Sequence, residues 1–485
     1  MSEKREFAVG TVLHLIVALV TILSGYAIHL WVARSLGPAS YGIFGIVMAF
    51  YHIIIPFLQA SFPKAASKFT AESRLNVAGV FKTALAYQVL LATVMFLLLL
   101  IFSDVLASHW FHDPSLKKYF QYLAFIIPPL SMYYLYFEGY LNGLRQFGRE
   151  AYGKIFFTLL RTALVFLFVL LGFEVLGILW GYFISSIVSV IVFALWWGFP
   201  KIRDQENFSP KIITNFAILT TLSALGLMLL RNLDVLVLKS LIGDNMQLGI
   251  YTAASTLAAA PYLLFSSLGV VLFPSISKAM KKNKIHLANK YLSQSIRYLL
   301  LMFVPVAAII AVTASNLISL VYSPAYAKAG PVLSILIFSS LFLIIFMLLL
   351  VVITSSNNPL LSMLFTFLGF VIMTASAYFF IPLFGLIGAA YASLLASAIS
   401  LCTVGIYVRS KYGRFLFHLS LGRIIFCSLV IGLLAYIWQP TGLMVLTSYI
   451  LLLLFYGLLL HLFGELQLED IRLFKEVICK FLRKA

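Results

Sequence analysis

Apolar runs long enough to cross a membrane follow one another along almost the whole chain, separated by short polar or glycine-containing turns. A helix needs about 20 apolar residues to span the hydrocarbon of a bilayer. Spans of a membrane β-barrel would be about 10 residues long with alternating polarity, a pattern the chain does not show. The sequence therefore predicts an all-α polytopic membrane protein with fourteen transmembrane helices. We expect them near residues 9–35, 40–63, 79–102, 119–142, 152–172, 175–199, 212–241, 247–275, 291–313, 329–355, 359–381, 386–409, 421–438 and 442–463.

Two stretches about 210 residues apart share the same order of features, which indicates an internal repeat. In each, a helix ends near a basic residue, a short turn follows, and a glycine, Gly42 or Gly249, opens the next helix. Each copy contains six helices, an even number, so both copies enter the membrane in the same sense. Such parallel repeats place a substrate site between them. Further pairs at the same interval are Phe62-Pro63 with Phe273-Pro274, Ser67-Lys68 with Ser277-Lys278, and Leu176-Gly177 with Ile387-Gly388.

The repeat predicts a division of the chain into four parts. Residues 1–205 form an N-terminal six-helix lobe, and residues 206–412 form a C-terminal six-helix lobe. Residues 413–463 add two transmembrane helices. In residues 464–485, apolar side chains at helical spacing alternate with Lys and Arg, which predicts an amphipathic helix on the cytoplasmic surface. A solvated basic tail is the alternative.

Composition excludes a soluble protein, and the distribution of charge predicts the orientation in the membrane. Charged residues make up 10% of the chain and hydrophobic residues 62%, whereas soluble domains are about 25% charged. The net charge of +18 arises from Lys and Arg concentrated in alternate connections. By the positive-inside rule both termini lie in the cytoplasm. The basicity thus reflects topology in a cytoplasmic membrane, and we expect no nucleic-acid partner.

Charged side chains within the spans are candidates for function, because each costs about 2.5–3.5 kcal/mol on insertion scales. Arg231 and Asp234 are three residues apart in one span and so share a helix face. When the two repeats are aligned on Arg34 and Lys239, Asp234 matches His29. The pattern predicts that Arg231, Arg34 and Lys239 bind an anionic substrate, while Asp234 and His29 couple transport to protons or sodium.

Each of these residues also has a plainer interpretation. Arg231 and Asp234 could neutralise each other within one helix, and His29 could be a hydrogen-bonded packing residue. Arg34 and Lys239 lie at helix ends, from which their charges could reach the interface. The sequence alone leaves both interpretations open.

Other polar residues lie in or near the spans and in the connections between them, and a structural role is favoured for Glu138. Glu138 lies near a helix end, where it could pair with nearby arginines, and Arg161 lies in or near a span. His109 and His112 stand beside Asp113 at a spacing that could ligate zinc, but without further ligands a solvated loop is the better interpretation. No GxxxxGK[ST] loop occurs, so the chain is not itself an ATPase. We expect no cofactor and no bound metal.

Four segments together resemble a known family. They are ARSLGPASYGIF at 33–44, FPKAASK at 62–68, the pair LDVLVLKSLIG and GIYTAA at 233–254, and FGLIGAAYA at 384–392. In this order they resemble the polysaccharide transporter family, the flippases of lipid-linked oligosaccharides within the multidrug, oligosaccharidyl-lipid and polysaccharide exporter superfamily. The resemblance covers essentially the whole chain.

The resemblance implies two six-helix lobes around a central cavity and alternating access. It also implies export of an undecaprenyl-type diphosphate carrier bearing a sugar unit for cell-surface polysaccharide. The expected partners are this lipid-linked sugar, membrane lipids and glycosyltransferases of the same pathway. A sodium site in related flippases needs further acidic ligands in later helices, and the span at 359–381 has none, which favours protons.

Two alternatives remain at this level. A drug or cation antiporter of the same superfamily would use a smaller cavity lined by acidic side chains. A membrane enzyme acting on polyprenyl-phosphate sugars would need clustered carboxylates or a large loop outside the membrane. The chain has only 16 acidic residues and no Asp-x-Asp pair, so we expect a transporter, not an enzyme.

Overall fold

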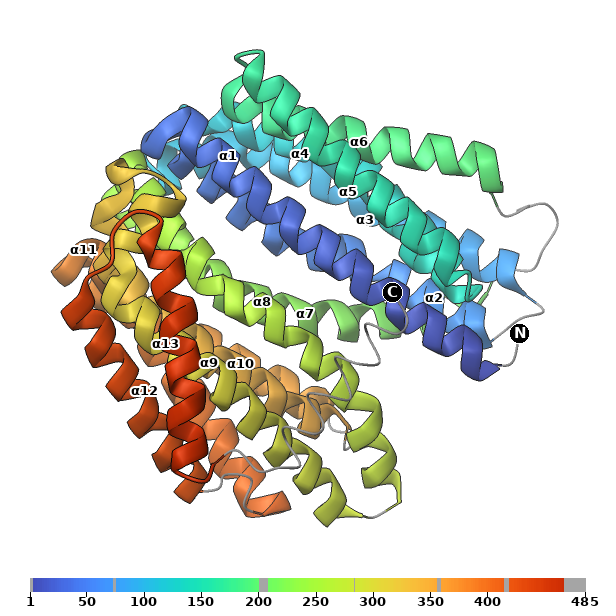
Figure 1. Cartoon of the computed structure of the whole chain (residues 1–485). Coiled ribbons are helices and arrows are strands. Elements are labelled where there is room, and N and C mark those ends of the chain that lie inside the picture. The colour runs from blue at the N-terminus through green and yellow to red at the C-terminus, as the bar shows by residue number, and fades with distance from the viewer. Residues whose placement is uncertain are drawn as a thin grey trace. The chain divides into compact units, whose positions relative to one another are not determined.

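Helices account for nearly all of the chain in the computed structural model (Figure 1). The structure describes residues 3–72, 76–199, 208–282, 284–355, 359–413 and 418–465. Within these ranges no strand occurs, so the predicted all-α class is confirmed.

The elements follow the predicted spans closely. The N-terminal part contains α1 (Glu3–Gln59), α2 (Phe62–Glu72), α3 (Val77–Asp104), the π-helix η1 (Val105–Trp110), α4 (Leu116–Tyr134), the π-helix η2 (Leu135–Leu141), α5 (Phe147–Leu170) and α6 (Glu174–Trp197). The C-terminal part contains α7 (Pro210–Ile242), α8 (Asn245–Lys281), α9 (Ile285–Val321), the 3-10 helix η3 (Pro324–Ala329), α10 (Gly330–Ser355), α11 (Pro359–Tyr412), α12 (His418–Trp438) and α13 (Met444–Leu462).

Two of the longest helices each contain two predicted spans. In α1 the direction changes at Gly37, whose φ of 75° and ψ of 178° are not helical. In α11 the change is at Gly385, with φ 59° and ψ −129°. Glycine adopts positive φ without the steric penalty that a Cβ atom would bring. Each predicted hairpin therefore turns at a single glycine, with almost no loop.

The described residues contain 10 helical segments that are long and apolar enough to cross a membrane. Two of these segments, Val12–Glu72 and Leu360–Tyr412, are 61 and 53 residues long, and each includes a glycine break. The polytopic character is thereby confirmed, while the count of fourteen spans stays a prediction. The predicted amphipathic tail lies outside the described residues except for its first two positions.

Contacts within the chain define two compact units. Unit 1 comprises Met1–Thr252 and Thr366–Ala392. Within it, α1 packs against α5 and α7, while α6 packs against α4 and α5. The unit thus contains the first predicted repeat, α7, the start of α8 and the middle part of α11. The predicted boundary between the two lobes, at residues 205/206, was inferred from the internal repeat, and it stays a prediction.

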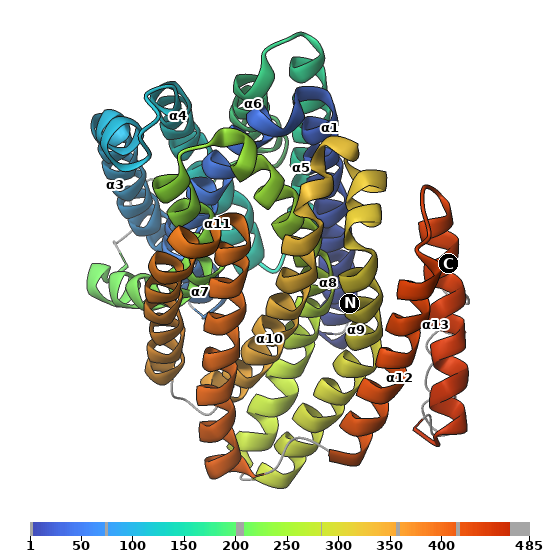
Figure 2. The same ribbon diagram turned by 90° about the vertical axis from the view of Figure 1, so that its left-hand side faces the viewer.

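Unit 2 comprises Ala253–Phe365 and Ser393–Ala485. Its centre is α9, which packs against α10 and α12. The helices α12 and α13 lie side by side (Figure 2). At their ends Glu465 accepts a hydrogen bond from Arg297 Nε of α9 at 2.9 Å. The two additional helices are thereby tied to the helix that forms the core of their unit.

Candidate functional site

The five residues predicted for the site come from one pair of helices in unit 1. Arg231, Asp234 and Lys239 lie on α7, and His29 and Arg34 lie on α1. The two helices pack against each other. The residues predicted to bind substrate and those predicted to couple transport therefore lie in one part of the molecule.

Asp234 and His29, which the repeat alignment matches, each share a hydrogen bond with a tyrosine further along the chain. Tyr251 Oη donates to Asp234 Oδ2 at 2.6 Å. His29 Nδ1 lies 2.9 Å from Tyr41 Oη, and the His29 ring is edge-on to Phe44 with 5.0 Å between centroids. Asp234 is buried and His29 is partly buried. Both titratable groups therefore lie in similar surroundings, each bonded to a second helical segment.

Arg231 is partly buried where α7 meets α1. It is close enough to Tyr26 and His52 to act on both electrostatically. Its neighbour Asn232 has Oδ1 3.3 Å from His52 Nδ1. The guanidinium thus lies beside polar and aromatic groups of α1, whereas Arg34 is exposed. Substrate binding by either arginine stays a prediction.

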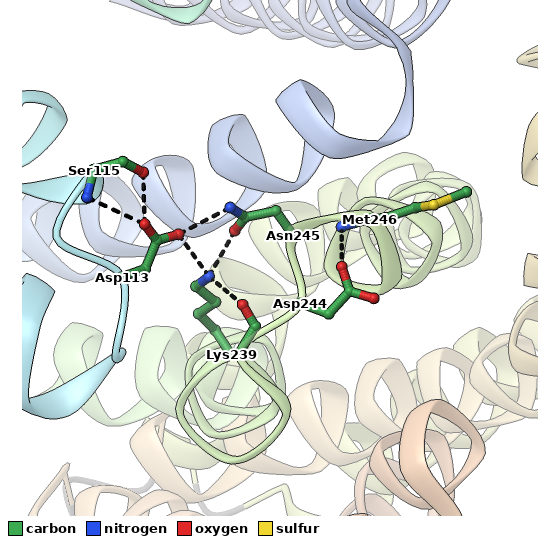
Figure 3. Close-up of polar contacts among 7 residues, drawn as sticks. Asp113, Ser115, Lys239, Asp244, Asn245 and Met246 are labelled. Carbon is green, nitrogen blue, oxygen red and sulfur yellow. Dashed lines mark hydrogen bonds and ion pairs between the residues drawn. The ribbon is translucent and has the colours of Figure 1, made fainter.

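Lys239 lies near the end of α7, and its ammonium group is surrounded by protein acceptors (Figure 3). Nζ donates to Asp113 Oδ2 at 2.9 Å, to Asn245 Oδ1 at 2.6 Å and to the Gly243 carbonyl at 2.6 Å. Asn245 Nδ2 donates to the same Asp113 oxygen at 2.8 Å. Lys239 is only 1% exposed. In this conformation all three ammonium hydrogens are used within the protein, and its predicted substrate contact would require this network to open.

Asp113 joins the first repeat to this network. It follows η1, and its Oδ1 accepts hydrogen bonds from the Ser115 backbone N at 3.2 Å and the Ser115 hydroxyl at 2.6 Å. Partial burial raises the pKa of Asp113, but the hydrogen bonds from Ser115, Lys239 and Asn245 outweigh burial and lower the pKa to about 2. The carboxylate is therefore charged at neutral pH. It forms an ion pair with Lys239 that links the loop after η1 to the α7–α8 turn.

The glycines that open the matched helices meet at the same end of unit 1. A Cβ atom on Gly42 would lie 2.0 Å from the Asn245 carbonyl oxygen, and one on Gly249 would lie 1.8 Å from the Pro38 carbonyl oxygen. The backbones of α1 and α8 therefore cross in direct contact, which only glycine allows. Two equivalent positions of the repeat thus form one crossing next to the Lys239 network.

An open pocket of about 420 Å³ lies beside these contacts, between η1, the end of α7 and α11. Both His109 and His112 line it, together with Ser240 and Tyr378. The two histidines face this pocket while Asp113 pairs with Lys239. Both histidines are exposed, but His109 lies in η1, so only His112 belongs to the loop that the sequence predicted.

Asp113 and Asn245 were not predicted as partners of Lys239. The ion pair joins residues 126 positions apart. A local sequence pattern cannot predict a contact over such a distance in the chain. A signal was nevertheless present. Asp113 and Lys239 carry opposite charges, and both lie in or near the connections that have few basic residues. An ion pair between them could have been proposed on that basis.

A second charged cluster lies in unit 1 at the start of α5. Lys154 Nζ is 2.9 Å from Glu138 Oε1 and 2.8 Å from Glu150 Oε1. Asn142 Nδ2 donates to Glu150 Oε2 at 2.7 Å. The structural pairing predicted for Glu138 is present, but its partner is a lysine and not an arginine.

Comparisons with known proteins find two family models along the chain. The model described as polysaccharide biosynthesis protein matches residues 7–280. The model described as MatE matches residues 220–379. An uncharacterized membrane protein of Methanocaldococcus jannaschii is 23% identical over 422 residues, covering 80% of this chain and 81% of the relative.

Solved structures with a similar fold include a flippase and transporters. The lipid II flippase MurJ in an inward closed conformation has a TM-score of 0.71 at 14% identity, covering 93% of this chain and 98% of its own. A multidrug resistance MATE family transporter of the MOP superfamily, inward-facing, has a TM-score of 0.68 at 18% identity, covering 82% and 98%. A MOP superfamily transporter from Pyrococcus furiosus, described as having a binding pocket of reverse polarity, has a TM-score of 0.59 at 16% identity, covering 84% and 96%. These likenesses show the shared transporter fold.

Proposed function

The chain belongs to the polysaccharide biosynthesis protein family, and on this premise we propose that it flips a lipid-linked sugar across the cytoplasmic membrane by alternating access. The substrate would be an oligosaccharide or polysaccharide repeat unit on a polyprenyl diphosphate, used for cell-surface polysaccharide. The likeness of its fold to a lipid II flippase supports this proposal. The lipid-linked sugar, membrane lipids and glycosyltransferases of the same pathway are the partners we propose.

The observation that carries the proposal is Arg231, a partly buried cation in the middle of an apolar helix. A diphosphate that enters a low-dielectric site needs a fixed counter-charge. A guanidinium supplies that charge with several donors in one plane, and the donors match phosphate oxygens in pairs. The neighbouring imidazole and phenol of α1 add hydrogen-bonding groups beside it.

We assign the contacts around Lys239 to the outer end of the transporter. The Asp113 ion pair and the crossing of Gly42 with Gly249 close this end of unit 1. A substrate leaving toward the outside would require both contacts to separate. Alternating access would therefore break a small set of defined contacts at this end, and Lys239 would then be released toward the substrate.

We assign the coupling of transport to protons at Asp234 and His29. Each is bonded to a tyrosine hydroxyl of a following helical segment. A neutral carboxyl or a charged imidazole would change these bonds. Proton exchange at either group would therefore alter the contact between two helical segments, which is what a coupling group must do.

The test is transport by purified protein in liposomes loaded with a fluorescent polyprenyl-diphosphate sugar. Arg231→Ala should reduce flipping at least tenfold, because a hydrogen bond to a charged group contributes about 1.5–3 kcal/mol. Arg231→Lys should restore it only in part, because the fork geometry is lost. The control is Arg149→Ala, which removes an exposed arginine. Equal flipping by Arg231→Ala and Arg149→Ala would remove Arg231 from the mechanism.

A second candidate function is drug or cation antiport, supported by the MatE model that matches residues 220–379. Such a transporter would move a cationic dye against a proton gradient in the same liposomes. Dye transport without flipping of the lipid-linked sugar would favour this second function.

A further inference from the structure

We propose that Arg161 of α5 is a second anion-binding residue, which receives phosphate or carboxylate oxygens of the substrate head group. This inference rests on the proposed function and extends it from α7 into the helices of the first repeat. It is carried by the contacts of Arg161, by the contrast with Lys154 on the same helix, and by the groups that connect Arg161 to Arg231.

The guanidinium of Arg161 is buried and poorly satisfied. The residue is 8% exposed. Nη2 lies 3.5 Å from Ser24 Oγ, at the limit of a hydrogen bond, and Nε is buried without an acceptor. The guanidinium carbon lies over the rings of Tyr182 and Phe157, 4.9 Å and 5.5 Å from their centroids. The surroundings of Arg161 are therefore aromatic, and most of its donors remain available.

Lys154 shows how this fold stabilises a buried cation that serves structure. It lies seven residues before Arg161, two turns earlier and on a similar face of α5. Lys154 has Glu138 and Glu150 within 2.9 Å. Among the residues that the structure describes, no carboxylate lies within ion-pair distance of Arg161. One cation of α5 is thus neutralised by carboxylates, and the other has no such partner in the described part of the chain.

A buried guanidinium without a counter-charge is costly, because its desolvation is not repaid. Contact with aromatic faces offsets only part of this cost. Arg161 could be replaced by an apolar residue with a gain in stability if it served only packing. A charged residue kept at such a position is explained by an anion that binds there during transport.

The neighbours of Arg161 connect it to Arg231. Arg161 acts electrostatically on His29, His29 is also influenced by His52, and His52 is influenced by Arg231. The four side chains, on α5, α1 and α7, therefore lie within electrostatic range of one another in this order. We propose that a head group with more than one anionic group uses both arginines.

The aromatic walls around Arg161 suit a sugar. Tyr51 lies edge-on to Tyr182 with 5.2 Å between ring centroids, and Tyr133 packs against Phe157 at 4.3 Å. Aromatic faces beside a guanidinium present a nonpolar surface next to a planar set of donors. This combination fits an anionic group attached to a sugar ring better than it fits a cationic drug.

The experiment measures thermal unfolding of the full chain in detergent with three probes: farnesyl diphosphate, glucuronate and glucose. The first supplies phosphate oxygens, the second a sugar carboxylate, and the third is a neutral control. For the native chain we expect at least one anionic probe to raise Tm and glucose to have no effect. The more effective anion identifies whether phosphate or carboxylate is the group bound.

Arg161→Met and Arg161→Gln should lose this response, with the concentration needed for half the Tm shift raised about tenfold or more. Without a probe, Arg161→Met should be at least as stable as the native chain, because it removes an unpaired buried charge. The matched control is Lys154→Met. It should be clearly less stable, because it strands two carboxylates, yet it should keep the native concentration dependence.

The outcomes separate the two proposals. A native response to an anion that persists unchanged in Arg161→Met and Arg161→Gln would overturn the role of Arg161 and leave the flippase proposal standing. A native chain that responds to neither anion would contradict both. If Arg161→Met does not fold, Arg161→Gln decides, because it keeps a hydrogen-bonding side chain near Ser24.

Discussion

At the scale of single residues, the cations of unit 1 differ in how the protein satisfies them. Lys239 and Lys154 are buried and held by carboxylates. Arg161 is buried with aromatic contacts, and Arg231 lies beside side chains of α1. These two lysines thus occupy closed ion networks, whereas the two arginines lie where we propose that an anionic substrate passes. The planar guanidinium suits that task better than an ammonium group.

Removing the charge of Asp113 tests the closed network at the end of α7. Asp113→Asn would leave the Lys239 ammonium buried without a counter-charge, so the unfolding free energy should fall by on the order of 3 kcal/mol. Chemical denaturation in detergent solution measures this change. The control is Asp244→Asn on the same turn, an exposed residue whose Oδ1 accepts from Met246 N at 2.8 Å. Asparagine serves as well at such a position, so its effect should be small.

The pH dependence of the Asp113 effect follows from its pKa of about 2. Because this value lies below the ordinary aspartate pKa, the stabilisation is present above the ordinary value and is lost as the pH falls toward 2. The difference between native protein and Asp113→Asn should therefore be the same at pH 8 and pH 5. A difference that shrinks by pH 5 would contradict a stable ion pair with Lys239.

At the scale of elements, the apolar runs predicted the helices well. The connections between the helices depend on local backbone geometry, which hydropathy does not report. The hairpin around Gly37 was predicted, but its two helices continue into each other through one non-helical residue. The short helix α2 and the π-helices η1 and η2 were not predicted. π-Helical turns depend on packing against neighbouring helices, so hydropathy alone cannot place them.

The crossing of α1 with α8 gives a prediction for an element contact. Gly42→Ala would place a methyl group 2.0 Å from the Asn245 carbonyl oxygen, so the helices must separate. We expect a loss of about 1–3 kcal/mol in unfolding free energy. Gly25→Ala is the matched control, since a Cβ atom there meets nothing within 4 Å. That change should be neutral or stabilising by up to about 1 kcal/mol, because alanine favours a helix. Equal effects of the two changes would contradict the close crossing.

At the scale of the whole molecule, the sequence predicted the class and the repeat more readily than the partners of its charges. Matched glycines proved informative, because Gly42 and Gly249 meet at one crossing. The alignment of His29 with Asp234 predicted equivalent positions, and both share a hydrogen bond with a tyrosine. The isolation of Arg161 could not be predicted. It depends on the side chains of the helices packed against α5, none of which places a carboxylate within ion-pair distance among the described residues.

The central claim is that this family member moves a lipid-linked sugar diphosphate. The most direct measurement uses liposomes that contain the purified chain and a fluorescent polyprenyl-diphosphate sugar, with a membrane-impermeant reductant added outside. With active protein, the fraction of probe in the inner leaflet should become accessible faster than in protein-free liposomes. A neutral polyprenol-linked sugar should move more slowly, because it offers no anion to Arg231. Exposure of the diphosphate probe at the protein-free rate, by protein that transports a cationic dye in the same liposomes, would contradict the account.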